Sequence, residues 1–477
     1  MSEPFARLDD LFHPRSVAIA GISSGTQNRG APGGGGNFLE SIREMGFDGP
    51  LYPVNPKAQE IAGLPCYPSL RDIPGPVDYL ISSVPAPAVP QLVEDAIAKG
   101  VRLIHFFTAG FSETGDDERS QLEQQVMTRL REAGIRVLGP NCMGLYVPTA
   151  RLSFMQGAPL EPGGTALVSQ SGANANDFVR QASERGVRFS TVVSYGNAAD
   201  LNESDLLAHA AADPATTAIF AYIEGVRSGR RFVEVLRQAA RNKPVVILKG
   251  GRTSAGARAA ASHTGSLAGS LQVFDALCRQ MGALRVESLE ELVDLAVAFR
   301  FLTPPAGRGV AVVGAGGGTS VLAADMIDAA GLEVPPLPAE VQEGLRRFTP
   351  VAGTSIRNPL DLMSMFQPEQ FATTLQLAAQ PDSIHAVLFH TNFGWGRRDD
   401  THVDNLIRSL VQGREAISKP LVVAVRPSLT GPGTEQTAAF VEACAREGIA
   451  LFPGIDRAAR ALARLVDWRD RQQKIAG

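Results

Sequence analysis

Three times along the chain, a short run of apolar residues passes through a small-residue turn into a helical pattern. The runs begin near residues 17, 165 and 310. A strand that enters a helix through a tight turn opens a βαβ unit, whose successive strands are parallel and whose crossover is right-handed. At each turn the helix N-terminus presents unpaired N–H groups to a ligand. The sequence therefore predicts three α/β units, each able to bind an anion.

The length of the chain agrees with this count, because 477 residues are too many for one hydrophobic core. The run "TPPAGRG" after residue 302 is a Pro/Gly break typical of a linker. We predict a Rossmann-like domain over residues 1–148, a second α/β domain over 149–302 and a third over 303–477.

Composition excludes several classes of protein. The net charge of −4 leaves no basic surface for nucleic acid, and no apolar run reaches the ~18 residues of a membrane span. The N-terminus has no basic segment followed by an apolar one, so no secretory signal is expected. Four scattered cysteines have neither metal-ligand nor disulfide spacing, which favours a reducing cytoplasm; they are Cys66, Cys142, Cys278 and Cys444.

The stretch "ARAAASHTGSLAGS", residues 257–270, places His263 among small residues. It contains no Cys, Asp or Glu that could share a metal or form a local catalytic pair. We expect a mobile loop whose imidazole collects an anionic group and carries it elsewhere. The alternative is an ordinary loop histidine without a role.

Two of the small-residue turns are candidate phosphate sites. Each could hold a phosphate on the N–H groups and the positive end of a helix that starts there. One phosphate can use both turns only if their domains meet. The alternatives are a Ser171 that simply caps a helix beginning near Asn174, and a tight turn at residue 316 that binds nothing. The candidate residues are Ser171, Gly172 and Ala173 in the second domain and Gly316, Gly317, Gly318 and Thr319 in the third.

The first glycine-rich turn does not match G-x-G-x-x-G. An NAD site would close the second strand with an acidic residue for the ribose, but here the strand ends with Asn55 and Lys57. A lysine favours a ligand with an extra phosphate, such as coenzyme A or NADP, although Lys57 could equally be a solvated loop residue.

In combination and in order, the motifs resemble those of the NDP-forming acyl-CoA synthetases, and most of all the α subunit of ADP-forming acetyl-CoA synthetases. Succinyl-CoA synthetase is a more distant relative. The motifs are "SVAIAG", "YPVNPK", "VPAP", "GPNCMGL", "ALVSQSGA", "SYGNAADLNESDLL", "YIEGVRSGRRF", "KPVVILKGGRT", "ASHTGSLAGS", "AGGGTSVLAAD" and "NPLDL".

The resemblance implies a CoA-binding Rossmann-like domain followed by two flavodoxin-like domains with parallel sheets. It implies that His263 is transiently phosphorylated, that Glu224 orients its imidazole, and that the two helix N-termini hold the phosphoryl group. The CoA cleft is expected to be lined by Gly21, Ser23, Ser24, Asn55, Lys57, Pro85, Thr108 and Asn141.

The resemblance also implies a partner, because no segment here resembles the ATP-grasp module that binds the nucleotide. A separate ATP-grasp β subunit carrying ATP or ADP with magnesium is expected, in an α2β2-type hetero-oligomer, with no metal on this chain. The substrate is expected to be a small carboxylic acid and its CoA thioester. Asn174 and Asn176 depart from acetate-type members and could select a polar or bulky acid, or be exposed amides.

Two other functions compete with a ligase. One is a CoA-binding regulatory protein that has lost catalysis, against which the intact His263 and Glu224 argue. The other is an NADP-dependent dehydrogenase, which lacks a suitable histidine–carboxylate pair. His105 and Cys142 are expected to be buried structural residues, and Trp395 a loop or partner contact. The long loop over residues 23–37 puts detailed CoA contacts in doubt.

Overall fold

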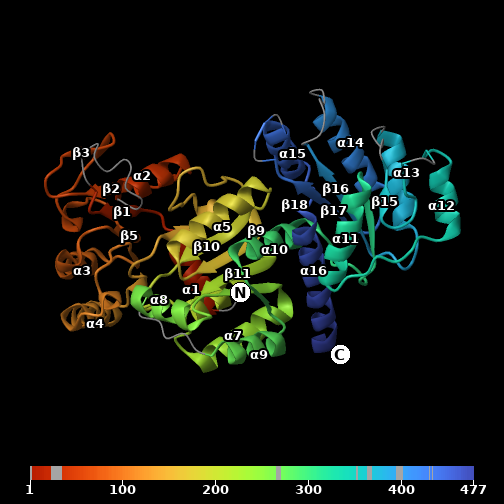
Figure 1. Ribbon diagram of the computed structural model, residues 1–477. Helices are drawn as coiled ribbons and strands as arrows, with labels where there is room; N and C mark the ends of the chain where they lie inside the picture. Colours follow the sequence, from red (N-terminus) through yellow and green to blue (C-terminus); the bar gives the residue numbers. More distant parts are fainter. Residues whose placement is uncertain are drawn as a thin grey trace. The chain divides into compact units, whose positions relative to one another are not determined.

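The structure is a computed structural model that describes residues 3–22, 35–264, 270–350, 353–362, 368–393, 401–428, 430–431 and 433–476. It divides into two compact units (Figure 1). Unit 1 comprises residues 1–180 and 188–289, and unit 2 comprises residues 181–187 and 290–477. Each unit is described on its own below. The predicted boundaries at 148 and 302 stay a prediction.

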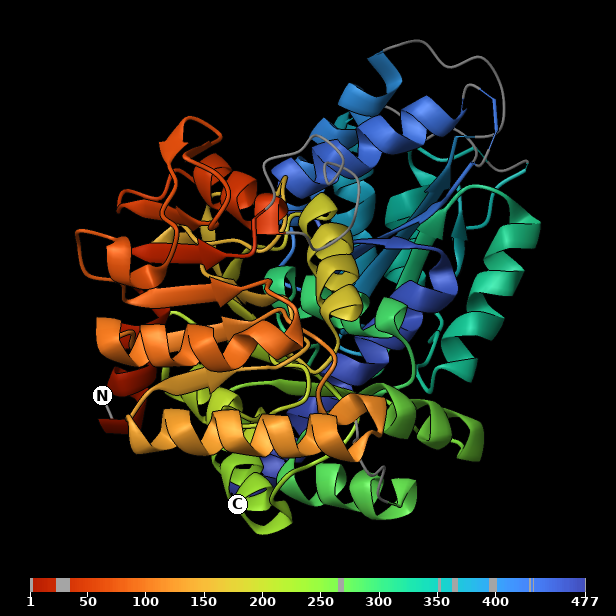
Figure 2. The ribbon, with the colours of Figure 1, turned by 90° about the vertical axis from the view of Figure 1, so that its left-hand side faces the viewer.

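The first sheet of unit 1 has five parallel strands in the order β2-β1-β5-β6-β7. The strands β1, β5 and β6 are buried along their whole length, as near-continuous apolar runs of a covered parallel sheet should be. Figure 2 shows helices α3 and α4 lying side by side along this sheet. The elements are β1 (Val17–Ala20), α2 (Gly35–Glu44), β2 (Leu51–Val54), β3 (Glu60–Ile61), β4 (Leu64–Pro65), η2 (Leu70–Asp72), β5 (Tyr79–Ser82), η3 (Ala86–Ala88), α3 (Val89–Lys99), β6 (Leu103–Phe106), η4 (Ser112–Thr114), α4 (Asp117–Glu132) and β7 (Arg136–Leu138).

The second sheet has six strands in the order β13-β12-β11-β9-β10-β8. Five are parallel, as predicted, whereas the edge strand β8 runs antiparallel to β10. β8 precedes residue 148, so the chain enters the second sheet before the predicted boundary. The elements are β8 (Gly144–Tyr146), η5 (Pro148–Ala150), β9 (Pro162–Ser169), α5 (Gly172–Glu184), β10 (Phe189–Ser194), α6 (Glu203–Ala212), β11 (Ala218–Ile223), α7 (Gly229–Asn242), β12 (Val245–Lys249), α8 (Ser254–Thr264), α9 (Leu271–Met281) and β13 (Leu284–Val286).

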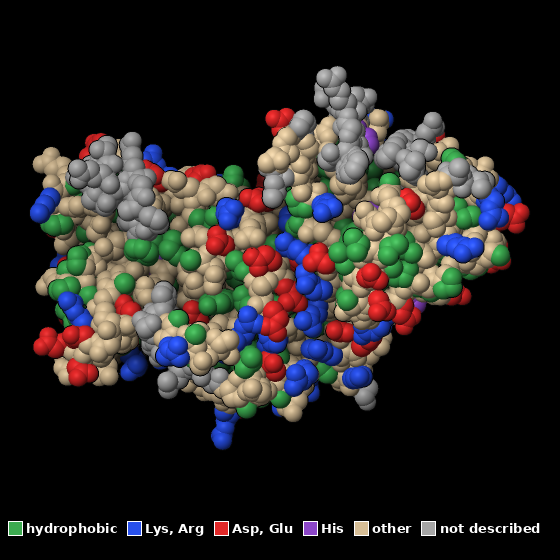
Figure 3. All heavy atoms as spheres, in the orientation of Figure 1, with side chains coloured by type: hydrophobic (Ala, Val, Ile, Leu, Met, Phe, Trp, Pro, Cys, Tyr) green, Lys and Arg blue, Asp and Glu red, His purple; other side chains and the backbone are tan. Residues whose placement is uncertain are grey.

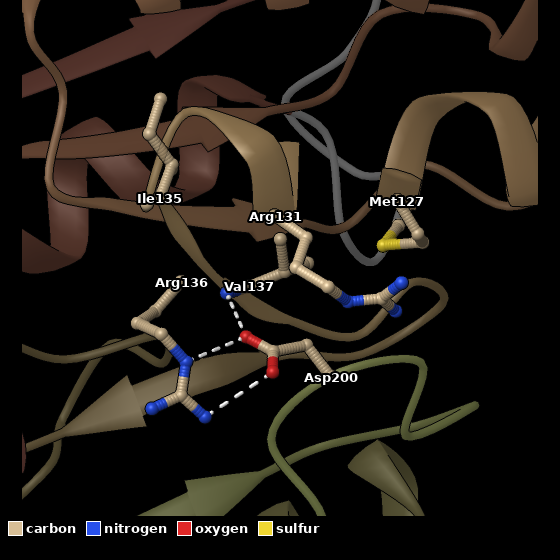
Figure 4. Close-up of a pocket in the computed structure, with 7 residues that line it drawn as sticks. Met127, Arg131, Ile135, Arg136, Val137 and Asp200 are labelled. Carbon is tan, nitrogen blue, oxygen red and sulfur yellow. Dashed lines mark hydrogen bonds and ion pairs between the residues drawn. The ribbon is translucent and has the colours of Figure 1, made fainter. Parts of the chain in front are cut away.

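The two sheets of unit 1 are joined by polar and apolar contacts. The carboxylate of Asp200, in the loop after β10, accepts hydrogen bonds from the Arg136 guanidinium at 2.8 and 3.2 Å and from the Val137 N–H at 2.9 Å. Figure 4 shows this pair beside a small pocket of about 100 Å³ between α4 and β7. The N-terminal helix α1 (Glu3–Phe12) packs on α6, where the rings of Phe12 and His209 meet edge to face. These contacts make the first two sheets one body.

Unit 2 contains the third sheet, with five parallel strands in the order β15-β14-β16-β17-β18. Its core includes Phe371 and Phe389, whose rings lie edge to face 5.0 Å apart. Buried Asp294 accepts hydrogen bonds from Arg185 and Arg457, which ties α10 to α16. The elements are α10 (Leu289–Phe301), β14 (Val310–Gly314), α11 (Gly317–Ala329), α12 (Ala339–Arg346), β15 (Leu360–Asp361), α13 (Pro368–Ala379), β16 (Ala386–Asn392), α14 (Thr401–Glu415), β17 (Leu421–Arg426), α15 (Gly433–Arg446), β18 (Leu451–Pro453) and α16 (Ile455–Ala476).

All three sheets therefore follow the strand order 2-1-3-4-5, with the edge strand β8 added to the second. The predicted α/β class, with a Rossmann-like domain and two flavodoxin-like domains, is confirmed. No helix in the described residues is long and apolar enough to cross a membrane. Within the same residues no three His, Cys, Asp or Glu side chains are grouped closely enough to hold a metal ion.

Candidate functional site

Each sheet has one point where the chain order reverses, between its first and third strands in sequence. In open parallel sheets, ligands bind outside the carboxyl ends of the strands at this switch point. The switch points lie between β1 and β5, between β9 and β11, and between β14 and β16. The small-residue turns predicted to bind anions all follow the first strand of each pair, so the three turns occupy equivalent places.

The first switch point gathers the predicted CoA residues on one edge. Gly21 follows β1 with φ +90°, and a Cβ there would lie 2.6 Å from the backbone of Ser83, which follows β5. Glycine is required because the two strand ends approach so closely. The other described candidates follow the neighbouring strands: Asn55 and Lys57 after β2, Pro85 after β5, Thr108 after β6 and Asn141 after β7. Ser23 and Ser24 lie outside the described residues.

Some of these candidates hydrogen-bond within the protein and support the turns, whereas others are exposed and available to a ligand. The Asn55 side chain donates to the carbonyl of Ile22 and accepts from the N–H of Lys57 at 2.8 Å, so it shapes the turn. The buried Thr108 hydroxyl donates to the carbonyl of Val84 at 2.8 Å and holds β5 and β6 together. Lys57 and Pro85 are exposed, and within the described part of the chain the Lys57 ammonium group has no partner. Among the described candidates the lysine is therefore the cation at this edge.

At the second switch point, Ser171 forms the turn that starts α5. Its hydroxyl accepts from the N–H of Asn174 at 3.3 Å, so Ser171 does cap the helix, which begins at Gly172 rather than near Asn174. A Cβ at residue 172 would lie 2.4 Å from the side chain of Met143, which explains the glycine. The N–H groups of Gly172 and Ala173 belong to the first turn and have no partner inside the helix, so they stay available to an anion.

Glu224 follows β11 and is therefore beside this turn. It is 6% exposed, and its backbone is fixed at two points. The amide oxygen of Gln170, the residue before Ser171, accepts from the N–H groups of Glu224 and Gly225 at 2.8 and 3.2 Å. The ammonium group of buried Lys249, at the end of β12, donates to the Glu224 carbonyl at 2.7 Å. Groups from the neighbouring strands on both sides of β11 thus hold the backbone of Glu224 in place.

The Glu224 side chain lies in a polar cluster. The Tyr222 hydroxyl donates to its carboxylate at 3.1 Å and is also hydrogen-bonded by the Asn174 side chain. Burial, and then the charge of Glu224, raises the pKa of Tyr222, so the phenol stays a donor at neutral pH. Burial lowers the pKa of Lys249, while the charge of Glu224 opposes the change. Asn174 and Asn176 are both half-buried on the first turns of α5.

Residue 263 lies in helix α8, which follows β12, the strand next to β11. The expectation of a loop throughout 257–270 is wrong for residues 257–264, because their backbone is helical. Alanine has the highest helix propensity, and four of the seven residues from Ala257 to His263 are alanine. Residues 265–269 lie outside the described part, as does the side chain of His263. α8 therefore begins at the same carboxyl edge as Glu224.

The third switch point has a different charge pattern. Gly316, with φ +105°, precedes α11, and its N–H donates to the carboxylate of Asp361 at 2.6 Å. One of the predicted phosphate donors is therefore already used by a carboxylate. Gly317 and Gly318 are exposed and Thr319 is half-buried in the first turn of α11.

A pocket of about 340 Å³ opens beside Thr319, at the carboxyl ends of β16 and β17. Arg426, the last residue of β17, is exposed at this pocket and has no partner among the described residues. The buried side-chain oxygen of Asn392 is also unpaired within that part of the chain. The apolar wall comes from Leu322 and Met326 of α11, and Figure 3 shows hydrophobic side chains gathered over this helix. The pocket therefore combines the guanidinium of Arg426, the amide of Asn392, an apolar wall and the carboxylate of Asp456, which is paired with Arg460 at 2.7 Å.

His390 forms the floor of this pocket and is 4% exposed. Burial lowers its pKa to about 4, while the charge of Asp361 acts in the opposite direction. The imidazole is therefore neutral at pH 7, and Arg426 dominates the positive charge of the pocket. A Cβ on Gly314 would lie 2.1 Å from its Nε2 atom, so the ring packs directly on the end of β14.

Two buried residues behave as the sequence predicts. His105 is fully buried and hydrogen-bonded through Nε2 to the carbonyl of Cys142 at 2.9 Å. Burial raises the pKa of the Cys142 thiol, which makes it a poor nucleophile. Trp395 lies outside the described residues. The sequence motifs gave no role to Gln170, Lys249 or Arg426, although each ends or directly follows an apolar strand, where functional side chains of parallel sheets lie.

Family models match the three sheets in turn. A CoA binding domain matches residues 15–148, a succinyl-CoA ligase-like flavodoxin domain residues 162–299, and a ligase-CoA domain residues 309–435.

Known proteins match over most of the chain. The α subunit of ADP-forming acetate–CoA ligase I from Pyrococcus furiosus is 35% identical over 97% of both chains. The ADP-forming acetate–CoA ligase I of Archaeoglobus fulgidus is 38% identical over 80% of this chain and 54% of its own. The structure of a dinucleotide-forming acetyl-CoA synthetase from Ca. Korarchaeum cryptofilum with phosphate and ADP is similar with a TM-score of 0.81, 31% identity and 98% coverage of both chains. The chain therefore belongs to the NDP-forming acyl-CoA synthetases and is related to the α subunits of ADP-forming acetate–CoA ligases.

Proposed function

We propose that this chain is the α-type subunit of an ADP-forming acid–CoA ligase and carries the phosphoryl group on His263. The reaction reversibly converts acyl-CoA, ADP and phosphate into the free acid, CoA and ATP. Inorganic phosphate first attacks the thioester carbonyl, which breaks the carbon–sulfur bond and releases CoA. The imidazole then attacks phosphorus of the acyl phosphate, which releases the carboxylate and leaves phosphohistidine.

The position of Glu224 carries this proposal. Glu224 is buried, and the strands on both sides of β11 fix its backbone, so the place of its carboxylate is set by the sheet. It lies at the edge where α8, the helix that contains residue 263, begins. In the proposed site Glu224 accepts the Nδ1–H of His263, which fixes the tautomer and leaves Nε2 as the nucleophile. The carboxylate then stabilises the cation that forms as Nε2 takes the phosphoryl group.

The helix N-termini supply the charge stabilisation that phosphoryl transfer needs. The free N–H groups of Gly172 and Ala173 suit a phosphate at the start of α5. The start of α11, through Gly317, Gly318 and Thr319, is proposed as the second phosphate-binding terminus. There Asp361 lies within hydrogen-bond distance of Gly316, so the phosphoryl group would have to approach from the exposed side of the turn.

The nucleotide is proposed to bind a separate ATP-grasp β subunit together with magnesium. The match covers about half of the relative from Archaeoglobus fulgidus, so that protein has a further region long enough for such a module. The related Pyrococcus furiosus protein is named as a subunit, and the structure from Ca. Korarchaeum cryptofilum contains ADP and phosphate. An α2β2-type assembly in the cytoplasm remains the expectation.

The pocket beside α11 is proposed as the subsite for the acid. Arg426 suits a carboxylate, because its guanidinium has no partner among the described residues. The unpaired oxygen of Asn392 is an acceptor, so it suits a hydroxyl or N–H group of the acid instead. Leu322 and Met326 offer an apolar surface to the rest of the acid. Asn174 and Asn176 remain proposed as residues that select a polar or bulky acid.

The test is to incubate the purified chain with acetyl-CoA and radiolabelled phosphate. We expect an acid-labile, base-stable phosphoryl adduct on the wild type that is absent from His263→Ala. The matched control is His13→Ala, which removes an exposed histidine that hydrogen-bonds Thr149 and should label as the wild type does. If CoA binds by calorimetry but the wild type stays unlabelled across a panel of acyl-CoA thioesters, the chain is a CoA-binding regulatory protein instead.

A further inference from the structure

The loop after β10 contacts the first sheet. Residues 195–199 hydrogen-bond to the turn that follows β7, where the Asn197 N–H donates to the Pro140 carbonyl at 3.0 Å. A Cβ on Gly196 would lie 2.3 Å from the carbonyl oxygen of Asn141. The loop is therefore pressed against the edge on which the CoA candidates lie.

Glu113, in the 3-10 turn η4, reaches this loop from the first sheet. One oxygen of its carboxylate accepts from the N–H groups of Gly110 and Phe111 at 2.6 and 3.2 Å. The other accepts from the fully buried amide of Asn197 at 2.7 Å. One side chain thus shapes the turn that follows Thr108 and holds the second sheet to it. The same turn packs against helix α8.

The contacts continue from Asn197 toward Glu224. The Asn197 carbonyl accepts from the guanidinium of Arg227, three residues after Glu224. The Arg227 N–H donates to the fully buried carboxylate of Glu203 at 2.9 Å. A continuous polar chain therefore runs from the CoA edge to the segment that carries Glu224.

The series of hydrogen bonds from Glu113 to Glu203 includes residues with unsatisfied polar atoms. Three buried atoms have no hydrogen-bond partner within the described part of the molecule: the Tyr195 hydroxyl, one oxygen of Asn197 and one oxygen of Glu203. Each such group costs about 1–3 kcal/mol if it stays unpaired, so a core selected for stability alone would replace it. Burial, and then the charges of Glu203 and Glu224, raise the pKa of the Tyr195 phenol, so the hydroxyl stays protonated at neutral pH.

We propose that Glu113 is a positioning residue that aligns the CoA edge of the first sheet with Glu224 on the second. It touches neither the thioester nor the phosphoryl group. Its pairing with Asn197 fixes where the thioester carbonyl lies relative to the phosphate site. The backbone of Glu224 is held by Gln170 and Lys249 within the second sheet, so Glu224 keeps its position when the link is broken.

This inference rests on the proposed function and predicts different effects on two half-reactions of the full-length chain. In the first, radiolabelled acetyl phosphate labels His263 without CoA. In the second, acetyl-CoA and radiolabelled phosphate label it through the CoA edge, measured at saturating acetyl-CoA. Glu113→Gln retains an acceptor for Gly110 but turns a donor toward the Asn197 amide. We expect it to slow the second half-reaction about tenfold or more and to leave the first within about twofold, since a lost charged hydrogen bond has this size.

Two further variants make the test specific. Asn197→Ala should show the same selective loss, and the double variant should be no slower than the worse single one, because both remove one contact. Ser112→Ala removes a hydrogen bond of the same turn that runs to Glu123 on α4, and it should leave both half-reactions unchanged.

The outcomes separate the two proposals. Equal slowing of both half-reactions by Glu113→Gln, or no slowing of either, overturns the positioning role while the labelled wild type upholds the proposed function. A wild type that neither donor labels overturns the proposed function and this inference together.

Discussion

The second and third sheets have the same strand order and a small-residue turn at the same place. Their switch points differ in how exposed the charged side chain is and in whether it has hydrogen-bond partners. At the second, Glu224 is 6% exposed and held by Gln170, Tyr222 and Lys249. At the third, Arg426 is exposed and without a partner among the described residues.

Helices α11 and α5 also differ, because α11 exposes more of its apolar side chains. On α11, Val321 and Leu322 are 64% and 55% exposed beside an open pocket, whereas on α5 Ala175 and Phe178 are buried. A site that moves a proton or phosphoryl group must hold its groups rigidly. A site that accepts a variable acid needs open volume and one strong charge. One topology thus supports a rigid polar cluster at one switch point and an open pocket at the other, as the two proposed roles require.

The largest expected effect comes from removing the charge of the rigid site. Glu224→Gln keeps the shape of the side chain but no longer stabilises the imidazolium, so labelling of His263 by acetyl phosphate should slow about 10²- to 10⁴-fold. The rate of adduct formation measures this. Glu161→Gln, which alters an exposed carboxylate paired with Arg188, is the control and should not change the rate. An equal rate in the two variants would remove Glu224 from the site.

A substitution in the open pocket should weaken the binding of the acid instead of slowing the chemical step. Arg426→Gln is expected to raise the KM for the acid about 10- to 100-fold, the size of a lost charged hydrogen bond, and to leave the KM for CoA unchanged. Steady-state kinetics in the direction of thioester synthesis, measured with the proposed β subunit and ATP present, give both constants. Arg446→Gln, at an exposed arginine of the same unit, is the control. A rise in the KM for CoA alone would mean that the pocket does not bind the acid.

A dependence of stability on pH should appear in both units. Burial lowers the pKa of His105 in unit 1 and of His390 in unit 2 to about 4 from an ordinary 6.5. The unfolded chain therefore binds more protons than the folded one between these values, so stability is complete above pH 6.5 and is lost as the pH falls. Each imidazole should account for about 2 kcal/mol between pH 7 and pH 5.

Urea unfolding at the two pH values measures this change. His390→Gln should flatten the dependence, and the exposed His13→Gln should not. A free energy of unfolding that rises toward pH 5 would contradict the assignment.

The smallest effect separates stability from binding at the third switch point. A Cβ on Gly318 meets no atom within 4 Å, so Gly318→Ala should raise the free energy of unfolding by up to about 1 kcal/mol. Gly314→Ala is the contrast, because its Cβ would collide with His390 and should cost about 1–3 kcal/mol. If Gly318→Ala is stable but labels slowly, the backbone at α11 approaches the phosphoryl group. Normal labelling would leave α11 without that role.

The sequence predicted the fold well because its strands are buried apolar runs and its turns use small residues, both of which are local signals. The same signals placed Gly21, Ser171 and Gly316 at strand ends, whereas Glu224 was identified only through the family resemblance. The prediction of a loop at residues 257–264 was wrong, because the high helix propensity of alanine favours a helix there.

The hydrogen-bond partners could not be predicted. Gln170 and Lys249 hold Glu224 only because β9 and β12 lie on either side of β11, which is a property of strand order. Glu113 and Asn197 are 84 residues apart and meet through two loops. The pocket at Arg426 likewise depends on how far α11 stands from β17, which no local pattern records.

Determining which ring nitrogen of residue 263 carries the phosphoryl group tests the central idea most directly. Phosphorus–nitrogen couplings in NMR spectra of the labelled, nitrogen-15-enriched chain identify the bond. A carboxylate that occupies Nδ1 predicts phosphorylation at Nε2. Phosphate on Nδ1, or on any residue other than His263, would contradict the account.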